Sequence, residues 1–224
     1  MGEGGSRAIP LWDLPTRLTH WAIAVAFGVS WYTADNHLMG AHRISGYVIL
    51  GLVVFRLYWG VAGGSTARFA SFVRGPGATL AYARTLPRRD SVAVAGHNPL
   101  GAWSVVAMIV LLAAQVGMGL FAVDVDGFES GPLSHWVSFE TGRTIAGAHE
   151  WGFRGLLVLI GLHLAAVAYY HLYKRQNLIG AMIHGRRRLG EGAEPLKGAP
   201  LWRVALGVAI AAGLAWAIAK GLRF

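Results

Sequence analysis

Two histidines, His149 and His163, lie inside an apolar stretch from Ile145 to Tyr173 that is long enough to cross a lipid bilayer. Fourteen residues of α-helix advance about 21 Å and return to within about 40° of the starting direction, so both imidazoles leave one stripe of the helix. An ionisable side chain inside a membrane is costly, and a neutral imidazole can find its partner in a metal ion. A lone helix histidine is more often a packing residue, whereas two on one stripe favour metal ligation.

Two further histidines lie near the starts of the first two apolar stretches. His20 falls within the first two turns of a helix expected over Thr16–Ala34, for which Thr16 is the expected N-cap. His42 opens a second helix, expected over Gly40–Val61. The sequence therefore offers four candidate metal ligands on three apolar helices.

The residues around these histidines favour haem b. Gly46, one turn after His42 on the same face, leaves room for a porphyrin, and Arg56 toward the far end of that helix can pair with a haem propionate. The chain has no cysteine, which excludes thiolate iron–sulfur clusters and haem attached through a cysteine motif. Zinc fits less well, because two separated two-histidine sites leave its tetrahedral shell incomplete.

The composition predicts the elements that must position these ligands. Of the 224 residues, 54% are hydrophobic and 14% are charged, which indicates an all-α integral membrane protein. We expect a four-helix di-haem bundle within residues 1–190, followed by a linker and a fifth transmembrane helix within residues 191–224. The expected spans are Thr16–Ala34, Gly40–Val61, Pro99–Val123, Ile145–Tyr173 and Leu201–Ala219.

The charges predict the orientation of the chain in its membrane. The net charge of +9 comes from connections such as residues 62–96 and 174–188, which we place in the cytoplasm, whereas the connection 124–143 is acidic and is placed outside. Residues 67–86 are expected to include a short interfacial helix. The N-terminus lacks the apolar core of a signal peptide and is expected inside, with the C-terminus in the periplasm. No pattern of nucleic-acid recognition is present.

This orientation pairs the four histidines. His20 lies near the inner face, His42 and His149 near the outer face, and His163 deeper on the inner side. The sequence therefore predicts two iron sites, His20 with His163 and His42 with His149. Bis-histidine coordination saturates iron and favours electron transfer over oxygen chemistry.

Much of the chain resembles a known family. The similar blocks are WDLPTRLTHW (12–21), HRISGYVILGLVVFRLYWG (42–60), ARFASFVRGP (67–76), GHNPLG (96–101) and AHEWGFRGLLVLIGLHLAAVAYYHLYKRQNLIGAMIHG (148–185). They resemble the bacterial cytochrome b561 family, which includes the cytochrome b subunit of nickel–iron hydrogenases and, more distantly, the gamma subunit of formate dehydrogenase. The resemblance implies four core helices around two b haems, with ligands at His20, His42, His149 and His163. The fifth helix is not part of that pattern.

The leading interpretation is a cytochrome that passes electrons between the quinone pool and a redox partner at the outer side, namely a c-type cytochrome or a reductase or dehydrogenase subunit. A stand-alone superoxide:quinone oxidoreductase is the first alternative, although the acidic outer loop disfavours attraction of an anion. A haem-containing membrane anchor of a redox complex is the second alternative. Contact with membrane lipid is expected throughout, and assembly into a homo-oligomer stays open.

Quinone is expected on the inner side. Arg17, Trp21 and His97 flank the predicted inner haem at the depth of the bilayer surface, and polar groups there can exchange protons with a quinone. His97 is otherwise an ordinary loop residue or a propionate partner. The rival residues on the outer side are Asp35, His37 and Glu150. Glu150 is also four residues before Arg154, so a simple ion pair is the other interpretation of that pair.

Overall fold

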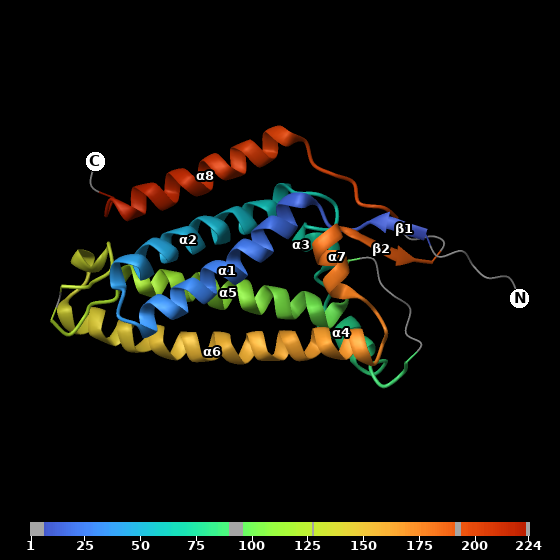
Figure 1. Cartoon of the computed structure of the whole chain (residues 1–224), viewed down its shortest axis with the longest axis horizontal. Helices are drawn as coiled ribbons and strands as arrows, with labels where there is room; N and C mark the ends of the chain where they lie inside the picture. The colour runs from blue at the N-terminus through green and yellow to red at the C-terminus, as the bar shows by residue number, and fades with distance from the viewer. Residues whose placement is uncertain (1–6, 90–95, 127, 191–193, 223–224) are drawn as a thin grey trace, which may run out of the picture. The chain divides into compact units, whose positions relative to one another are not determined.

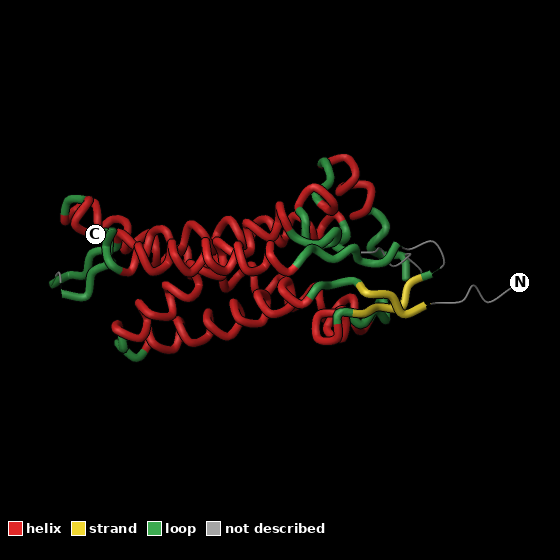
Figure 2. The backbone as a smooth tube through the Cα atoms, turned by 90° about the horizontal axis from the view of Figure 1, so that it is seen from above, coloured by secondary structure: helices red, strands yellow, loops and turns green. Residues whose placement is uncertain are grey.

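The computed structural model describes residues 7–89, 96–126, 128–190 and 194–222 (Figure 1). Its helices are α1 (Leu14–Asp35), α2 (Met39–Ala62), α3 (Phe69–Phe72), α4 (Pro76–Ala83), α5 (Pro99–Phe121), α6 (Phe139–Leu172), α7 (Leu178–His184) and α8 (Leu201–Ala219), with a 3-10 turn at Ser134–Trp136. Two short strands, β1 (Arg7–Pro10) and β2 (Arg186–Leu189), pair antiparallel and lie beside each other in both views (Figure 2). The all-α prediction therefore needs one addition, this two-stranded sheet.

Local chemistry explains where α1 begins and where α7 ends. A carboxylate oxygen of Asp13 accepts the backbone N–H of Thr16 at 2.9 Å, so Asp13 caps α1 and the prediction of Thr16 as the cap is wrong. The carboxylate lies three residues before that N–H, which is the reach a capping side chain needs. The helix α7 stops at Gly185, whose φ of 75° ends the helical path with a conformation that glycine adopts readily.

The predicted apolar stretches all form helices, with one large boundary error. The helix α6 begins at Phe139 rather than at Ile145, so the last residues of the expected outer loop are its first turns. The expected interfacial helix within 67–86 is present as two short helices, α3 and α4. Residues 73–75 separate them, and Pro76 at the first position of α4 is a normal helix start.

Four helices of the described chain are long and apolar enough to cross a membrane, namely α2, α5, α6 and α8. The helix α1 has 22 residues but is not among them, because polar and aromatic residues flank its apolar middle. The prediction that α1 also crosses the membrane, as one of five spans, stays a prediction. The protein is a multi-pass membrane protein in which α1 is the most polar long helix.

The chain folds into two compact units. The first contains Met1–Leu18, Tyr58–Ala107 and Leu159–Val204, and the second contains Thr19–Leu57, Met108–Val158 and Ala205–Phe224. The unit boundaries fall inside long helices, so helix α6, for example, contributes residues to both. The predicted division was between a core of residues 1–190 and a C-terminal region of residues 191–224, and it does not coincide with a boundary of either unit. Residues 191–193 lie outside the described part.

The second unit is a helical bundle whose core comes from four helices. Ala26 on α1, Val53 on α2, Val116 on α5 and Leu156 on α6 are buried in one apolar cluster. The helix α8 approaches α2 closely, since a Cβ added at Gly51 would lie 3.7 Å from Cβ of Ala215. Small residues allow such close packing of membrane helices.

The first unit has a smaller core around the strands. Ile9, Leu11, Trp12, Ala181 and Leu189 are buried together, and they come from β1, the chain before α1, α7 and β2. The amide groups of Leu11 and Trp12 both donate to the carbonyl of Gly185, at 2.8 and 3.2 Å. This unit therefore depends on contacts between segments that are far apart in the sequence.

Candidate functional site

The second unit brings together His42, near the start of α2, and His149, on α6. The centroids of the two imidazole rings are 6.2 Å apart and the ring planes are nearly perpendicular, at 86°. Both side chains are half-buried. We call these two residues the histidine pair.

A backbone carbonyl orients each imidazole of the pair. Nδ1 of His42 lies 2.9 Å from the carbonyl oxygen of Ser30 on α1, and Nδ1 of His149 lies 2.9 Å from the carbonyl oxygen of Gln115 on α5. A carbonyl can only accept, so Nδ1 is the protonated nitrogen in each ring and Nε2 keeps its lone pair. The oxygen Oγ of Ser30 also lies 3.2 Å from Nδ1 of His42. Both rings are thus prepared to bind a metal through Nε2.

The spacing of the pair fits one metal ion between two imidazoles. Two metal–nitrogen bonds of about 2 Å each, with the nearer half of each ring, span about 6 Å between centroids. A Cβ added at Gly46, one turn after His42, would meet no atom within 4 Å, so this glycine faces space that a flat group can enter. Within the described residues, no three His, Cys, Asp or Glu side chains gather as a metal site. The donor set fits bis-imidazole haem iron better than zinc.

Gln115 on α5 forms two hydrogen bonds with His149 on α6, and the sequence analysis did not identify this residue. Its backbone carbonyl accepts from His149, while its side-chain Nε2 donates to the backbone carbonyl of His149 at 2.9 Å. Gln115 is 8% exposed, and a Cβ at Gly152 would lie only 2.3 Å from its Oε1, so Gly152 makes the room. An amide inside an apolar helix was the available signal, because such a group needs a partner there.

The other two predicted ligands lie in different units. His20 belongs to the second unit, where its ring meets the edge of Trp21 with centroids 5.0 Å apart. His163 belongs to the first unit and is half-buried on α6. It follows His149 by fourteen residues on one continuous helix, which puts both on one stripe about 21 Å apart.

Arg56 is 7% exposed on α2, a deep burial for a guanidinium. It follows His42 by fourteen residues, so by helical geometry it lies on the same side of α2, about 21 Å along the axis. Arg17, by contrast, donates from Nη1 to the carbonyl of Ile183 on α7. The structure therefore shows a structural contact for Arg17.

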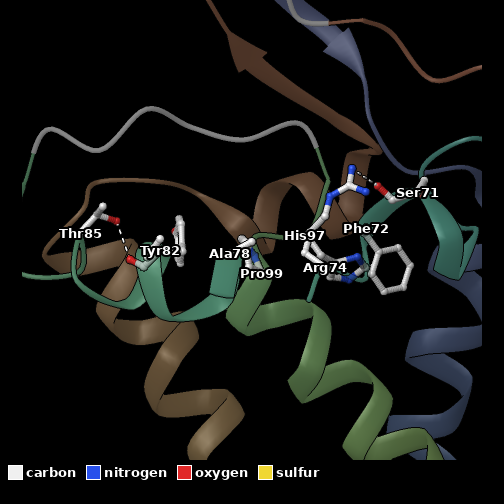
Figure 3. Close-up of a pocket in the computed structure, with 9 residues that line it drawn as sticks. Ser71, Phe72, Arg74, Ala78, Tyr82, Thr85, His97 and Pro99 are labelled. Atoms are coloured by element: carbon white, nitrogen blue, oxygen red, sulfur yellow. Dashed lines mark hydrogen bonds between the residues drawn. The ribbon is translucent and has the colours of Figure 1, made fainter. Parts of the chain in front are cut away.

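His97 lies in the first unit and lines a cavity of about 440 Å³, which we call the His97 pocket. Its ring is held between Trp12 and Phe72, each with a centroid distance of 4.6 Å. Figure 3 shows His97 beside Phe72, with Arg74 and Tyr82 also at the cavity. The pocket is thus amphipathic, with aromatic rings, a guanidinium and hydroxyl groups.

Hydroxyl and amide groups hold the wall of this pocket. The hydroxyl of Tyr82 on α4 lies 2.9 Å from that of Tyr170 on α6, and the amide of Asn98 donates to the same Tyr170 oxygen at 3.0 Å. Burial lowers the pKa of the nearby Arg187 guanidinium, and the phenols of Tyr82 and Tyr170 oppose that change. The polar network connects α4, α6 and the start of α5.

The rival residues on α1 and α6 have simpler roles in the structure. Glu150 and Arg154 form an ion pair, as the spacing predicted, and the guanidinium also lies 4.6 Å from the centroid of Trp151. His37 is exposed with a φ of 56° and forms the turn between α1 and α2. Asp35 is exposed at the end of α1.

A family model for prokaryotic cytochrome b561 matches residues 11–185. The chain belongs to this family. Membership makes it a membrane cytochrome of electron transport, with haem b as its cofactor. The matched range includes all four candidate ligands and the His97 pocket, and it ends before α8.

Three curated relatives of the cytochrome carry the name probable Ni/Fe-hydrogenase B-type cytochrome subunit. The protein from Azotobacter chroococcum is 28% identical over 218 residues, which cover 80% of this chain and 88% of the relative. Those from Azotobacter vinelandii and Cupriavidus necator are 27% and 26% identical, covering 80% and 81% of this chain and 88% and 87% of the relatives. No solved structure matches the chain.

Proposed function

We propose that this cytochrome is a di-haem electron carrier that connects the quinone pool to a redox partner protein. The observation that carries the proposal is the histidine pair, with ring centroids 6.2 Å apart and both Nδ1 atoms bound to backbone carbonyls. When bound, haem supplies a one-electron couple of its iron. The two fixed rings would hold the haem with little rearrangement between oxidation states, which favours electron transfer.

Each residue near the pair has a proposed task. His42 and His149 present Nε2 to the iron, and the carbonyls of Ser30 and Gln115 hold the rings and raise their basicity. Gly46 gives the macrocycle access to α2. Arg56 lies farther away, fourteen residues after His42 and about 21 Å along α2. It is a proposed partner of a haem propionate, because a guanidinium binds a carboxylate through charge-assisted hydrogen bonds.

His20 and His163 are proposed as ligands of the second haem. Two observations support this assignment. His149 and His163 lie on the same side of α6, and His20 lies in the first turns of α1. A pyridine haemochrome assay on the purified, fully reconstituted protein tests it. We expect about two haems per chain, one for each pair of axial ligands, whereas a ratio near one contradicts the second site.

The names of the relatives point to a hydrogenase as the redox partner. They are called cytochrome subunits of a Ni/Fe hydrogenase, and they align with this chain over most of their length. A c-type cytochrome or another dehydrogenase or reductase subunit is the remaining candidate class. Affinity purification from the native membrane, followed by mass spectrometry of the co-purified subunits, distinguishes these partners.

The His97 pocket is the proposed quinone site. Its volume of about 440 Å³ and its mixture of rings and polar groups suit a quinone head group, which needs apolar walls and proton donors. The variant His97→Ala should slow haem reduction by quinol and leave both haem spectra unchanged. Unchanged quinol kinetics in His97→Ala, together with a strong defect in His37→Ala, would move the site to the Asp35–His37 turn.

The proposed setting is the bacterial inner membrane with the N-terminus in the cytoplasm and the C-terminus in the periplasm. This orientation requires that α1 crosses the membrane together with α2, α5, α6 and α8, so that the number of spans is odd. The basic connections between α2 and α5 and after α6 support it. We assign α8 and the preceding linker to an accessory region outside the di-haem core.

A further inference from the structure

A second cavity, of about 340 Å³, lies within the second unit and has no role in the function proposed above. Three segments line it: the beginning of α2, the chain from Ser130 to His135, and the end of α8. These segments meet closely, since a Cβ at Gly221 would lie 3.1 Å from the carbonyl oxygen of Pro132. We call this cavity the α8-end pocket.

The lining of the α8-end pocket is basic. Arg43, His135 and Lys220 contribute to it, together with the hydroxyl-bearing residues Tyr47 and Ser134. Among the described residues, none that lines the pocket is acidic. The nearby carboxylate of Glu129 lies 3.5 Å from Nη1 of Arg43, so it balances one of the three basic residues. The remaining excess of donors and positive charge favours an anion.

The end of α8 does not cancel this preference. A helix C-terminus normally presents free carbonyl groups, which repel anions. Here the N–H groups of Lys220, Gly221 and Leu222 donate to the carbonyls of Trp216, Ile218 and Ala217, at 3.1, 2.8 and 3.0 Å. The last turn therefore closes on itself, and the charge of Lys220 dominates this wall of the pocket.

The pocket also lies at the depth of a lipid head group. The spans α2 and α8 are both long and apolar, α2 begins at Met39, and α8 ends at Ala219, next to the lining residues of the pocket. Farther along α2, the apolar side chains of Ile44 and Val48 are 65% and 50% exposed. An acyl chain can cover these side chains while the head group stays in the pocket.

We propose that the α8-end pocket binds the phosphate of an anionic phospholipid. Arg43 and Lys220 supply the charge, and the hydroxyls of Tyr47 and Ser134 are donors to the phosphate oxygens. A zwitterionic lipid carries an ammonium group that the same basic residues repel, so the pocket discriminates by head-group charge. Bound lipid would join α8 to α2 at this end of the second unit.

The test measures lipid binding to the haem-loaded protein in detergent. Native mass spectrometry would follow titration with phosphatidylglycerol and, separately, with phosphatidylcholine. The double variant Tyr47→Phe, Lys220→Gln is compared with Lys197→Gln, which removes an exposed lysine of the first unit. We expect the double variant to bind phosphatidylglycerol about tenfold more weakly, because the ammonium of Lys220 and the hydroxyl of Tyr47 no longer contact the phosphate. The control variant should bind like the wild type.

Three outcomes overturn the proposal. One is wild-type affinity for phosphatidylglycerol in the double variant, and another is equal binding of phosphatidylcholine by the wild-type protein. The third is displacement of phosphatidylglycerol by millimolar inorganic phosphate, which would assign the pocket to free phosphate. The haem absorption spectrum, recorded in every sample, shows whether the variants are folded, so the result does not depend on the proposed electron transfer.

Discussion

The histidine pair and the His97 pocket place the same side chain in two different kinds of surroundings. His42 and His149 lie on long helices, and backbone carbonyls of neighbouring helices hold their Nδ1 atoms. His97 lies in a connection just before α5, where it makes tilted ring contacts with Trp12 and Phe72. The first arrangement fixes a ring nitrogen in space, and the second fixes a ring plane beside a cavity.

This difference suits the histidine pair to the metal proposed for it, and the His97 pocket to the exchangeable quinone proposed for it. A metal ligand must keep its position in both oxidation states, and a helix-to-helix carbonyl contact provides that rigidity. A substrate site must admit and release a molecule, and a pocket formed by short helices and a connection can adapt to it. Variants that affect one region and spare the other test this comparison.

The largest expected effect is complete loss of one haem in His149→Ala. Removal of this imidazole would leave His42 as the one remaining ligand of the pair, so we expect the haem there to be lost during purification. The pyridine haemochrome ratio should fall by about half, since one of two bis-histidine sites is lost. The matched control is His135→Ala, an exposed histidine of the same unit, which should keep the full content.

The second prediction concerns Gly46. The variant Gly46→Leu should lose most of the haem held by the pair, because its side chain would fill the space that the protein leaves open there. Leucine also favours a helix more than glycine does, by about 1 kcal/mol, so the helix itself should not weaken. The control Gly213→Leu makes the same exchange on α8, where a Cβ also meets no atom within 4 Å. Equal haem loss in both variants would contradict the assigned role of Gly46.

A smaller and more specific effect is expected from Gly119→Ala. The added Cβ would lie 3.1 Å from Cε1 of His149, so the ring must move by a few tenths of an ångström. Haem should remain bound while its midpoint potential changes by about 30 mV. For a one-electron couple, 59 mV corresponds to a tenfold change in the equilibrium constant between the oxidised and reduced forms, so this shift is about half of that. A spectroscopic redox titration measures this shift. Gly117→Ala, on the opposite side of α5, is the control and should leave the potential unchanged.

The parts of the molecule that follow from local periodicity could be predicted from sequence. The helices α2, α5 and α8 begin and end within two residues of the expected positions, and the approach of His42 to His149 agrees with the pairing expected from orientation. Helical periodicity and apolar length suffice for this, because each helix satisfies its own backbone groups. The start of α6 was missed, since its first turns carry Glu140 and Arg143 and resemble a polar loop.

The contacts that depend on distant segments could not be predicted. The pairing of β1 with β2, the link from Tyr82 to Tyr170 and the hydrogen bonds of Gln115 all join residues more than thirty positions apart. A tyrosine in an apolar helix gives no indication of which hydroxyl it will meet, because the partner depends on how two other segments fold. Of the three residues predicted to flank an inner quinone site, Arg17, Trp21 and His97, only His97 lines this pocket, and the structure adds the other residues around it.

The smallest expected effect is on the free energy of unfolding, and it concerns the wall of the His97 pocket but not the histidine pair. Tyr170→Phe removes the hydroxyl that contacts Tyr82 and Asn98, and it should lower the free energy of unfolding by about 1 kcal/mol, the usual contribution of a hydrogen bond. Tyr170 is 7% exposed, so water cannot easily replace the lost contact.

Tyr173→Phe is the control, because its hydroxyl donates to the carbonyl of Pro87 from an exposed position. Thermal unfolding followed by tryptophan fluorescence should show the lower midpoint only for Tyr170→Phe, with the haem content of both variants unchanged. A loss of haem in Tyr170→Phe would show that the polar wall of the His97 pocket supports a haem site as well, and the distinction between the two regions would then fail.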